Sequence, residues 1–167
     1  IFYPAQYWFH KNHFELVEAF KIVSKTFDDV HLILTGSKTN NYSVQNYNNL
    51  LQRIDELSLQ DRVKHLGYVD YEDLPYLYKM SQFLVMPTLF ESVSIPIYEA
   101  FALEVAVCSS NVVALPEQVG DAGLIFNPND IYDIAENMKK YLNDDSLRKE
   151  KARLGFEKVK GFNHENY

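Results

Sequence analysis

The chain is predicted to adopt an α/β fold in which helices cover both faces of a parallel sheet of about six strands. Short apolar runs alternate along its 167 residues with stretches of helical periodicity, which is the pattern of strand–helix–strand units. The runs are almost continuously apolar, as expected for strands buried on both faces. With 47% hydrophobic residues, including 12 Tyr and 11 Phe, the chain can fill one core, and its length fits a single domain over residues 1–167.

Six apolar runs are the expected strands. They cover residues 1–5, 30–35, 63–66, 83–86, 105–108 and 123–126. The fifth run contains the single cysteine, Cys108, which we expect to be a small buried hydrophobe because reactive thiols need an exposed, electropositive setting. Parallel sheets bind ligands beyond the carboxyl ends of their strands, so the segments that follow these runs are the candidate sites.

The expected helices lie between and after these runs. Apolar stripes at helical spacing run over residues 16–27, 44–57, 74–78, 134–142 and 147–160. Asn12 followed by Glu15 has the spacing of a capping box at the start of the first helix, and Asp130 with Asp133 precedes the stripe at 134–142 in the same way. Pro96 fits the first turn of a helix after the fourth strand, where its missing N–H has no cost.

The charge balance excludes some classes of partner. The chain has 16 Lys and Arg against 23 Asp and Glu, and its net charge of -7 argues against non-specific binding to nucleic acid. No apolar run approaches the ~20 residues of a membrane span, and the first residues lack the layout of a signal peptide. Because residues 1–5 already have the pattern of a strand and residues 162–167 that of a helix start, we expect the chain to be part of a longer protein.

The segment after the first strand offers an anion site. Lys11 precedes the N-terminus of the first helix, and a helix start adds free N–H groups and a positive dipole end. A solvated lysine beside a packed Trp8 is the alternative. His10 and His13 are too few to indicate a metal site. Gly36, after the second strand, allows either a tight turn or a close approach of the backbone to a ligand.

Two carboxylates follow the fourth strand. Glu91 lies in the loop and Glu99 about one turn into the next helix, with seven residues between them. A carboxylate accepts hydrogen bonds from both hydroxyls of a ribose cis-diol, while a phosphate takes the N–H groups of a helix start, and a nucleotide sugar has both kinds of group. The alternative, that each glutamate only favours the helix dipole, stays open from spacing alone.

Taken in order, these motifs resemble the C-terminal, donor-binding half of retaining GT-B glycosyltransferases with a Glu-x7-Glu signature, in particular bacterial mannosyltransferase-like sequences. The resemblance covers nearly the whole chain and implies a Rossmann-like sheet. It rests on Tyr3-Pro4-Ala5-Gln6, His10-Lys11-Asn12-His13, Leu34-Thr35-Gly36-Ser37, Leu66-Gly67-Tyr68-Val69, Glu91 with Glu99, Leu115-Pro116-Glu117, Gly120-Asp121-Ala122 and Phe126-Asn127-Pro128-Asn129-Asp130.

The resemblance assigns roles to matching positions. It implies that Lys11 neutralises the pyrophosphate of the donor, with Gln6 standing where many members have an arginine. Glu91 would approach the hydroxyls of the donor sugar, and Glu99 would hold the ribose diol. The remaining donor contacts that it implies are Gly36, the backbone of Tyr68 and Val69 beside the base, and the amides of Val93, Ser94 and Ile95.

The resemblance also implies a reaction. A sugar would pass from a nucleotide-diphosphate sugar, GDP-mannose or a UDP-sugar, to an acceptor hydroxyl with retention of the anomeric configuration, and the leaving phosphate would help to take the acceptor's proton. No metal ion or other cofactor is expected. The acceptor, a glycan or a lipid-linked sugar, would bind an N-terminal domain outside this chain, so the chain alone is expected to be inactive. The protein would act in the cytoplasm, at the inner face of the membrane through that missing half.

The sequence departs from the family pattern at three places. Ser92-Val93-Ser94 stand where many members have Gly-Phe-Gly, Glu104 stands where glycine is usual, and Ala106 stands where proline is usual. Two alternatives therefore stay open: a sugar-nucleotide epimerase or a phosphorylase of the same architecture, or a catalytically degenerate α/β module used for assembly. Nucleotide binding that depends on Glu99 and Lys11 would separate the enzymes from the module.

Overall fold

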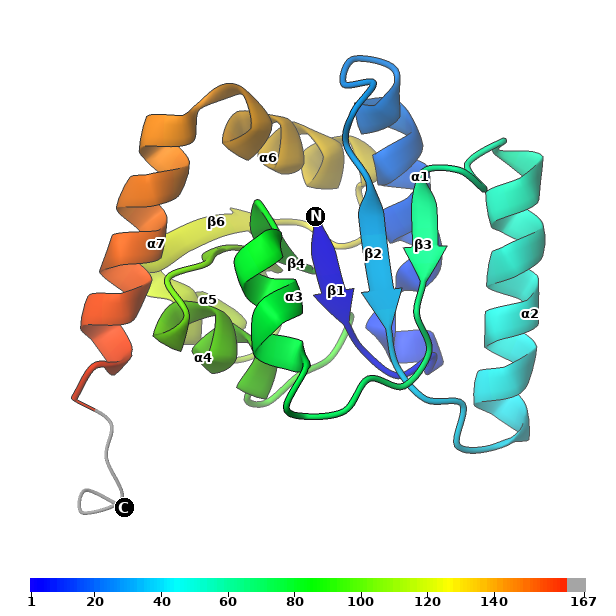
Figure 1. Ribbon diagram of the computed structural model, residues 1–167, viewed down its shortest axis with the longest axis horizontal. Coiled ribbons are helices and arrows are strands. Elements are labelled where there is room, and N and C mark those ends of the chain that lie inside the picture. Colours follow the sequence, from blue (N-terminus) through cyan, green and yellow to red (C-terminus); the bar gives the residue numbers. More distant parts are fainter. Residues whose placement is uncertain (162–167) are drawn as a thin grey trace.

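Six parallel strands form one sheet in the order β3-β2-β1-β4-β5-β6 (Figure 1). The structure is a computed structural model and describes residues 1–161. The strands are β1 (Phe2–Pro4), β2 (Leu32–Thr35), β3 (Val63–His65), β4 (Phe83–Met86), β5 (Ala106–Ser110) and β6 (Gly123–Phe126). The predicted fold class is confirmed, whereas the helix start expected at 162–167 lies outside the described residues.

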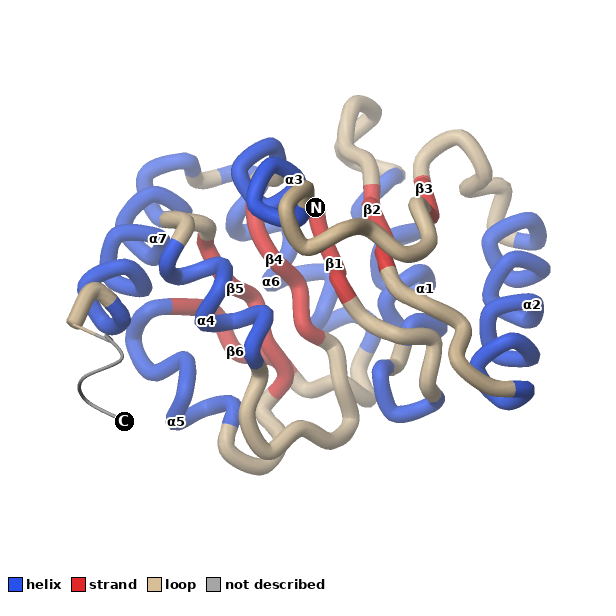
Figure 2. Tube along the Cα trace, turned by 60° about the horizontal axis from the view of Figure 1, so that its bottom comes forward, coloured by secondary structure: helices blue, strands red, loops and turns tan. Residues whose placement is uncertain are grey.

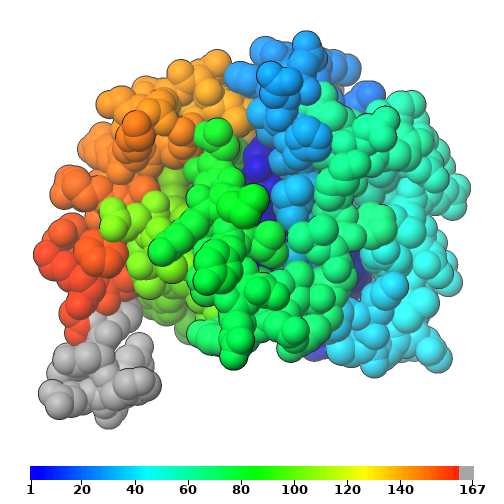
Figure 3. All heavy atoms as spheres, in the orientation of Figure 1, coloured from blue at the N-terminus to red at the C-terminus, as the bar shows by residue number. Residues whose placement is uncertain are grey.

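Helices cover both faces of this sheet. They are α1 (His13–Ser24), α2 (Asn41–Glu56), α3 (Leu74–Met80), α4 (Ile95–Ala102), α5 (Leu115–Val119), α6 (Ile131–Asn143) and α7 (Asp145–Val159), with the short 3-10 helices η1 (Phe9–Lys11) and η2 (Gly120–Ala122). On one face α1 packs against α6 and α2, and on the other α4 packs against α7. Figure 3 shows α3 and the loop before it standing across the middle of this second face.

The centre of the sheet carries the core. Every residue of β4 and β5 is buried, which explains why these two runs are the most clearly apolar of the sequence. Cys108 lies at the centre of β5 with 0% exposure, so the prediction of a small buried hydrophobe is confirmed. Burial also raises the pKa of its thiol.

The start of α1 differs from its prediction. Asn12 does not cap this helix, because its backbone has φ 58 and ψ 39 instead of the extended conformation of an N-cap. Asparagine tolerates this left-handed conformation. Its buried side-chain amide donates instead to the carbonyl oxygens of Pro87, at 3.0 Å, and Pro128, at 2.9 Å. The capping-box prediction is therefore wrong, and Asn12 ties together the loops that follow β1, β4 and β6.

Two other helix starts are as predicted, and one helix is new. The side chain of Asp130 accepts the backbone N–H groups of Tyr132 and Asp133 at the start of α6. Pro96 occupies the first turn of α4. Helix α5 was not predicted, since five residues are too few to show helical periodicity.

Candidate functional site

The candidate site lies where the strand order reverses. β1 pairs with β2 on one side and with β4 on the other, so connections leave β1 and β4 in opposite directions along the sheet. Open α/β sheets bind ligands outside the carboxyl ends of the strands at such a point. Figure 2 brings this edge forward and shows the loops gathered along it.

Hydrogen bonds join the loops after β1 and β4. The carbonyl oxygen of His10 accepts the backbone N–H of Leu89 at 2.7 Å and the hydroxyl of Thr88 at 3.0 Å. Ser110, at the end of β5, donates its hydroxyl to the carbonyl oxygen of Thr88 at 2.7 Å. The ends of three neighbouring strands are thereby fixed to one another.

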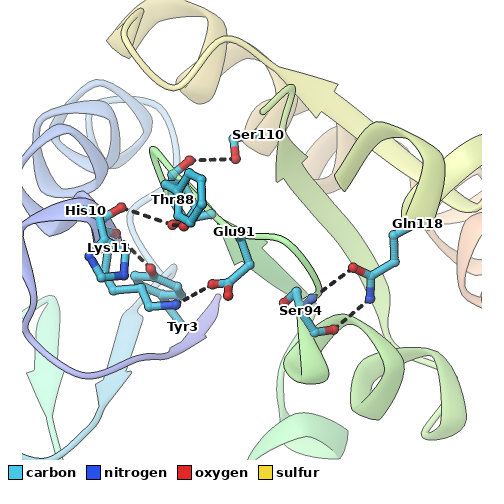
Figure 4. Close-up of polar contacts among 9 residues, drawn as sticks. Tyr3, His10, Lys11, Thr88, Glu91, Ser94, Ser110 and Gln118 are labelled. Carbon is cyan, nitrogen blue, oxygen red and sulfur yellow. Dashed lines mark hydrogen bonds and ion pairs between the residues drawn. The ribbon is translucent and has the colours of Figure 1, made fainter. Parts of the chain in front are cut away.

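Lys11 and Glu91 meet across this junction (Figure 4). Lys11 ends η1, Glu91 lies in the loop after β4, and the ammonium group forms an ion pair with Oε2 of the carboxylate. Both side chains are mostly buried, with exposures of 18% and 20%. The hydroxyl of Tyr3 donates to the carbonyl oxygen of Lys11 at 2.7 Å. Burial, and then the charge of Glu91, raise the pKa of Tyr3, so the phenol stays protonated and keeps donating.

The first turn of α4 lies beside this ion pair. Ser94, the N-cap residue, is buried, whereas the side chains of Val93 and Ile95 are exposed. The Ser94 N–H donates to Oε1 of Gln118 at 2.9 Å, and Nε2 of Gln118 donates to the Ser94 carbonyl oxygen at 2.7 Å. The expectation of a free amide at Ser94 therefore does not hold, and the amides of Val93 and Ile95 remain as candidates.

Glu99 faces a separate pocket between α3 and α4. The hydroxyl of Tyr78 donates to Oε2 of Glu99 at 2.7 Å. Burial, and then the charge of Glu99, raise the pKa of Tyr78 and keep its proton in place. The pocket has a volume of about 180 Å³ and is lined by Tyr71, Leu74, Pro75, Tyr78, Glu99, Ala102 and Leu103. One carboxylate at the side of an apolar, aromatic pocket suits a ribose with its attached base.

Gly36 follows β2 directly and packs tightly against the chain after β1. Its φ is 153, and a Cβ atom there would lie 2.1 Å from the carbonyl oxygen of Ala5, so no other residue fits. Its N–H donates to the carbonyl oxygen of Gly67 at 2.8 Å. Gly36 therefore holds the strand ends together, and its amide is already used within the protein.

The other predicted donor residues lie along the same edge. Gln6 follows β1, and its Oε1 accepts the hydroxyl of Thr39 at 3.5 Å. Tyr68 is 72% exposed, while Val69 is partly buried, in the loop between β3 and α3. The structure thus brings Lys11 and Glu91 into contact with each other. The other predicted donor residues, Glu99 among them, lie at separate places along the carboxyl edge of the sheet.

Two residues of this site were missed from sequence. Tyr78 belongs to the predicted apolar stripe of α3, and a buried tyrosine hydroxyl needs a partner, so a bond to a nearby carboxylate was detectable in principle. Gln118 gave no signal, because it lies in a helix too short to be recognised and its partner is backbone.

Within residues 1–161 there is neither a candidate membrane-spanning helix nor a candidate metal site. None of their helices has the length and apolar character needed to cross a membrane. Nor do three or more His, Cys, Asp or Glu side chains within this range come together in an arrangement that could hold a metal ion.

Comparison with known proteins identifies the family of the chain. Residues 1–156 match the family described as glycosyl transferases group 1. The chain is 41% identical over 117 residues to O-antigen chain mannosyltransferase B of Escherichia coli, which covers 70% of this chain and 31% of that protein. It is 31% identical over 123 residues to O-antigen chain mannosyltransferase RfbU of Salmonella typhimurium, covering 74% and 33%. The chain thus spans about a third of the length of these relatives.

Solved structures show the same fold. Sucrose-phosphate synthase from Thermosynechococcus elongatus superposes with a TM-score of 0.90 at 25% identity, over 99% of this chain and 41% of that one. Anabaena Alr3699/HepE, solved in complex with UDP and glucose, superposes with a TM-score of 0.88 at 20% identity, over 97% and 44%. The GT-B resemblance found in the motifs is confirmed, and the chain belongs to the glycosyl transferases group 1 family.

Proposed function

We propose that this chain is the donor-binding domain of a retaining glycosyltransferase, which transfers a sugar from a nucleotide-diphosphate sugar to a glycan or a lipid-linked acceptor. The observation that carries the proposal is the contact of Lys11 with Glu91 where the strand order reverses. A cation and a carboxylate side by side, both partly reachable, suit a ligand in which a diphosphate is joined to a polyhydroxylated sugar.

The donor would extend along the carboxyl edge of the sheet. Its ribose would reach Glu99, and its base would enter the pocket beside Tyr78, bordered by the backbone of Tyr68 and Val69. Its pyrophosphate would lie at Lys11 and its sugar at Glu91. The relatives named as mannosyltransferases favour mannose as the transferred sugar and GDP-mannose as the first donor to test.

The proposed chemistry is the one that the resemblance to retaining GT-B glycosyltransferases implies. The bond from the anomeric carbon to the leaving phosphate breaks while the acceptor oxygen bonds to the same face of that carbon. The acceptor's proton passes to the leaving phosphate oxygen. The negative charge that grows on the diphosphate is stabilised by Lys11 and by peptide N–H groups at the start of α4. The proposal assigns no step to a metal ion or other cofactor.

The acceptor would bind elsewhere in the full-length protein. Since the chain spans about a third of its relatives, we propose that an N-terminal domain completes the cleft and binds the acceptor. We propose, from the relatives named for O-antigen chains, that the full-length protein acts at the inner face of the cytoplasmic membrane. The net charge of -7 disfavours non-specific binding of this domain to nucleic acid.

A product assay on the full-length protein tests the proposal. The protein is incubated with GDP-mannose or a UDP-sugar and a lipid-linked glycan acceptor, and the product linkage is determined by NMR. We expect a glycoside with the anomeric configuration of the donor. An epimerised sugar nucleotide or a sugar phosphate would point to the other enzymes of this architecture, and the absence of both binding and turnover would contradict the proposal.

A further inference from the structure

Gln118 holds the first turn of α4 by two bonds. Its side-chain oxygen accepts the Ser94 N–H at 2.9 Å, and its side-chain nitrogen donates to the Ser94 carbonyl oxygen at 2.7 Å. Only this orientation of the amide makes both bonds, so the hydrogen-bond network determines it. Both residues are buried, with exposures of 8% for Gln118 and 1% for Ser94. The contact joins α5 to the loop that carries Glu91.

This arrangement replaces the usual cap of the helix. The N-cap serine makes no side-chain capping bond, and its hydroxyl is buried without a hydrogen-bond partner among the described residues. The conformation of the turn is therefore set from outside the helix, by a residue 24 positions further along the chain. An apolar residue at this position would leave the buried Ser94 N–H without this bond, so Gln118 also contributes to the stability of the turn.

The two bonds orient two consecutive peptide units. The Ser94 N–H belongs to the unit shared with Val93, and the Ser94 carbonyl to the unit shared with Ile95. Peptide bonds of the described residues are trans, so the N–H of each unit points opposite to its carbonyl. Because Gln118 draws the Ser94 carbonyl towards α5, the Ile95 N–H points away from Gln118. In Figure 4, Gln118 approaches Ser94 from one side, while Glu91 and Lys11 lie on the other.

We propose that Gln118 is a positioning residue that turns the Ile95 N–H towards the diphosphate of the donor and removes the Ser94 N–H from it. Pro96 follows and has no N–H. The orientation of the peptide unit between Ser94 and Ile95 therefore largely determines whether the start of α4 presents an N–H donor to an anion. The inference rests on the proposed donor-binding function and adds to it how the helix start is prepared for phosphate.

The experiment compares two kinds of ligand, nucleoside diphosphates and free nucleosides, in wild type and three variants of the full-length protein. Calorimetry measures the dissociation constants of the diphosphates GDP and UDP and of the free nucleosides guanosine and uridine. Gln118→Met keeps the size of the side chain and removes both bonds. Gln118→Glu keeps the acceptor for the Ser94 N–H and loses the donor to the carbonyl. Gln52→Met, on the exposed face of α2, is the matched control.

We expect Gln118→Met to raise the dissociation constant of the preferred diphosphate about tenfold and to leave that of its nucleoside unchanged. A residue with a merely structural role would not affect the diphosphate selectively. Gln118→Glu should likewise raise the dissociation constant of the diphosphate alone at neutral pH. This second variant tests the inference if the methionine variant does not fold. An unchanged diphosphate constant, or equal losses for diphosphate and nucleoside, would overturn the inference alone. Wild-type protein that binds neither diphosphate would overturn the donor assignment, and the inference with it.

Discussion

Lys11 places a positive charge beside Glu91 at the ends of neighbouring strands, and the reaction depends on that charge if the leaving group is a diphosphate. We expect Lys11→Ala in the full-length protein to lower kcat by roughly 100- to 1000-fold, the range for removing one group that stabilises transition-state charge. Initial-rate measurements with GDP-mannose test this. Lys25→Ala, which removes an exposed lysine just after α1, is the control. A kcat equal to that of the control would contradict the role of Lys11.

The hydroxyl of Tyr78 fixes one oxygen of Glu99 at 2.7 Å, and the other oxygen stays available to a ribose hydroxyl. Tyr78→Phe removes this bond to a charged group, for which about 1.5–3 kcal/mol is typical, together with a longer bond of 3.4 Å to the carbonyl oxygen of Pro96. We therefore expect the dissociation constant of the nucleotide to rise about tenfold. Tyr141→Phe removes a comparable buried bond, 2.9 Å long, to the carbonyl oxygen of Val107 in the core. It should lower stability similarly and leave nucleotide affinity unchanged, and equal affinities in both variants would contradict the positioning of Glu99.

His13 makes stability depend on pH. It lies buried between the rings of Tyr3 and Tyr7, and burial lowers its pKa from 6.5 to about 3. Between these values the unfolded chain binds a proton that the folded chain does not, so stability falls as the pH falls. From pH 7 to pH 5 the free energy of unfolding should drop by about 2 kcal/mol through this residue. Urea unfolding of wild type and His13→Gln at both pH values checks this, because the variant should lose that part of the pH dependence whatever its stability at pH 7.

At the scale of elements, the end of α4 stores strain. Glu104 follows the helix with φ 56, a left-handed conformation that costs a residue with a Cβ roughly 1–2 kcal/mol and that glycine adopts freely. We expect Glu104→Gly to stabilise the domain by about 0.5–1 kcal/mol, since the added freedom of the unfolded chain offsets part of the gain. Urea unfolding measures this. Glu104→Ala keeps the Cβ and should show no such gain, so equal stabilisation by both would assign the effect to charge instead.

The elements also show what sequence can reveal. The buried strands were placed within a few residues because β4 and the first three residues of β5 are continuously apolar, a pattern that can be recognised without knowing which strands lie beside them. The carboxylates were placed because parallel strands bring their carboxyl ends to one edge. Contacts made across the sheet were not foreseen. Asn12 bonds to loops 75 and 116 positions away, and Gln118 bonds to backbone 24 positions away, so neither contact has a local pattern.

For the whole molecule, the segments that carry Lys11, Glu91 and Glu99 follow neighbouring strands of one sheet with one continuous core. We therefore expect the isolated 167-residue chain to bind the donor nucleotide without transferring its sugar, because we have proposed that the acceptor binds an N-terminal domain outside this chain. Nucleotide at ten times its dissociation constant stabilises by about 1.4 kcal/mol, which is a rise in Tm of roughly 3–6 °C for a domain of this size.

Thermal melting with GDP, UDP and their sugars, with and without EDTA, measures this rise. It should persist in EDTA, since no metal ion is assigned to the diphosphate, and it should vanish in Lys11→Ala and in Glu99→Ala but not in Lys25→Ala. Loss of the rise in EDTA would show that a metal ion shares the diphosphate with Lys11. Flat melting curves for the isolated chain, beside clear binding by the full-length protein, would instead show that the donor site is completed only by the second domain.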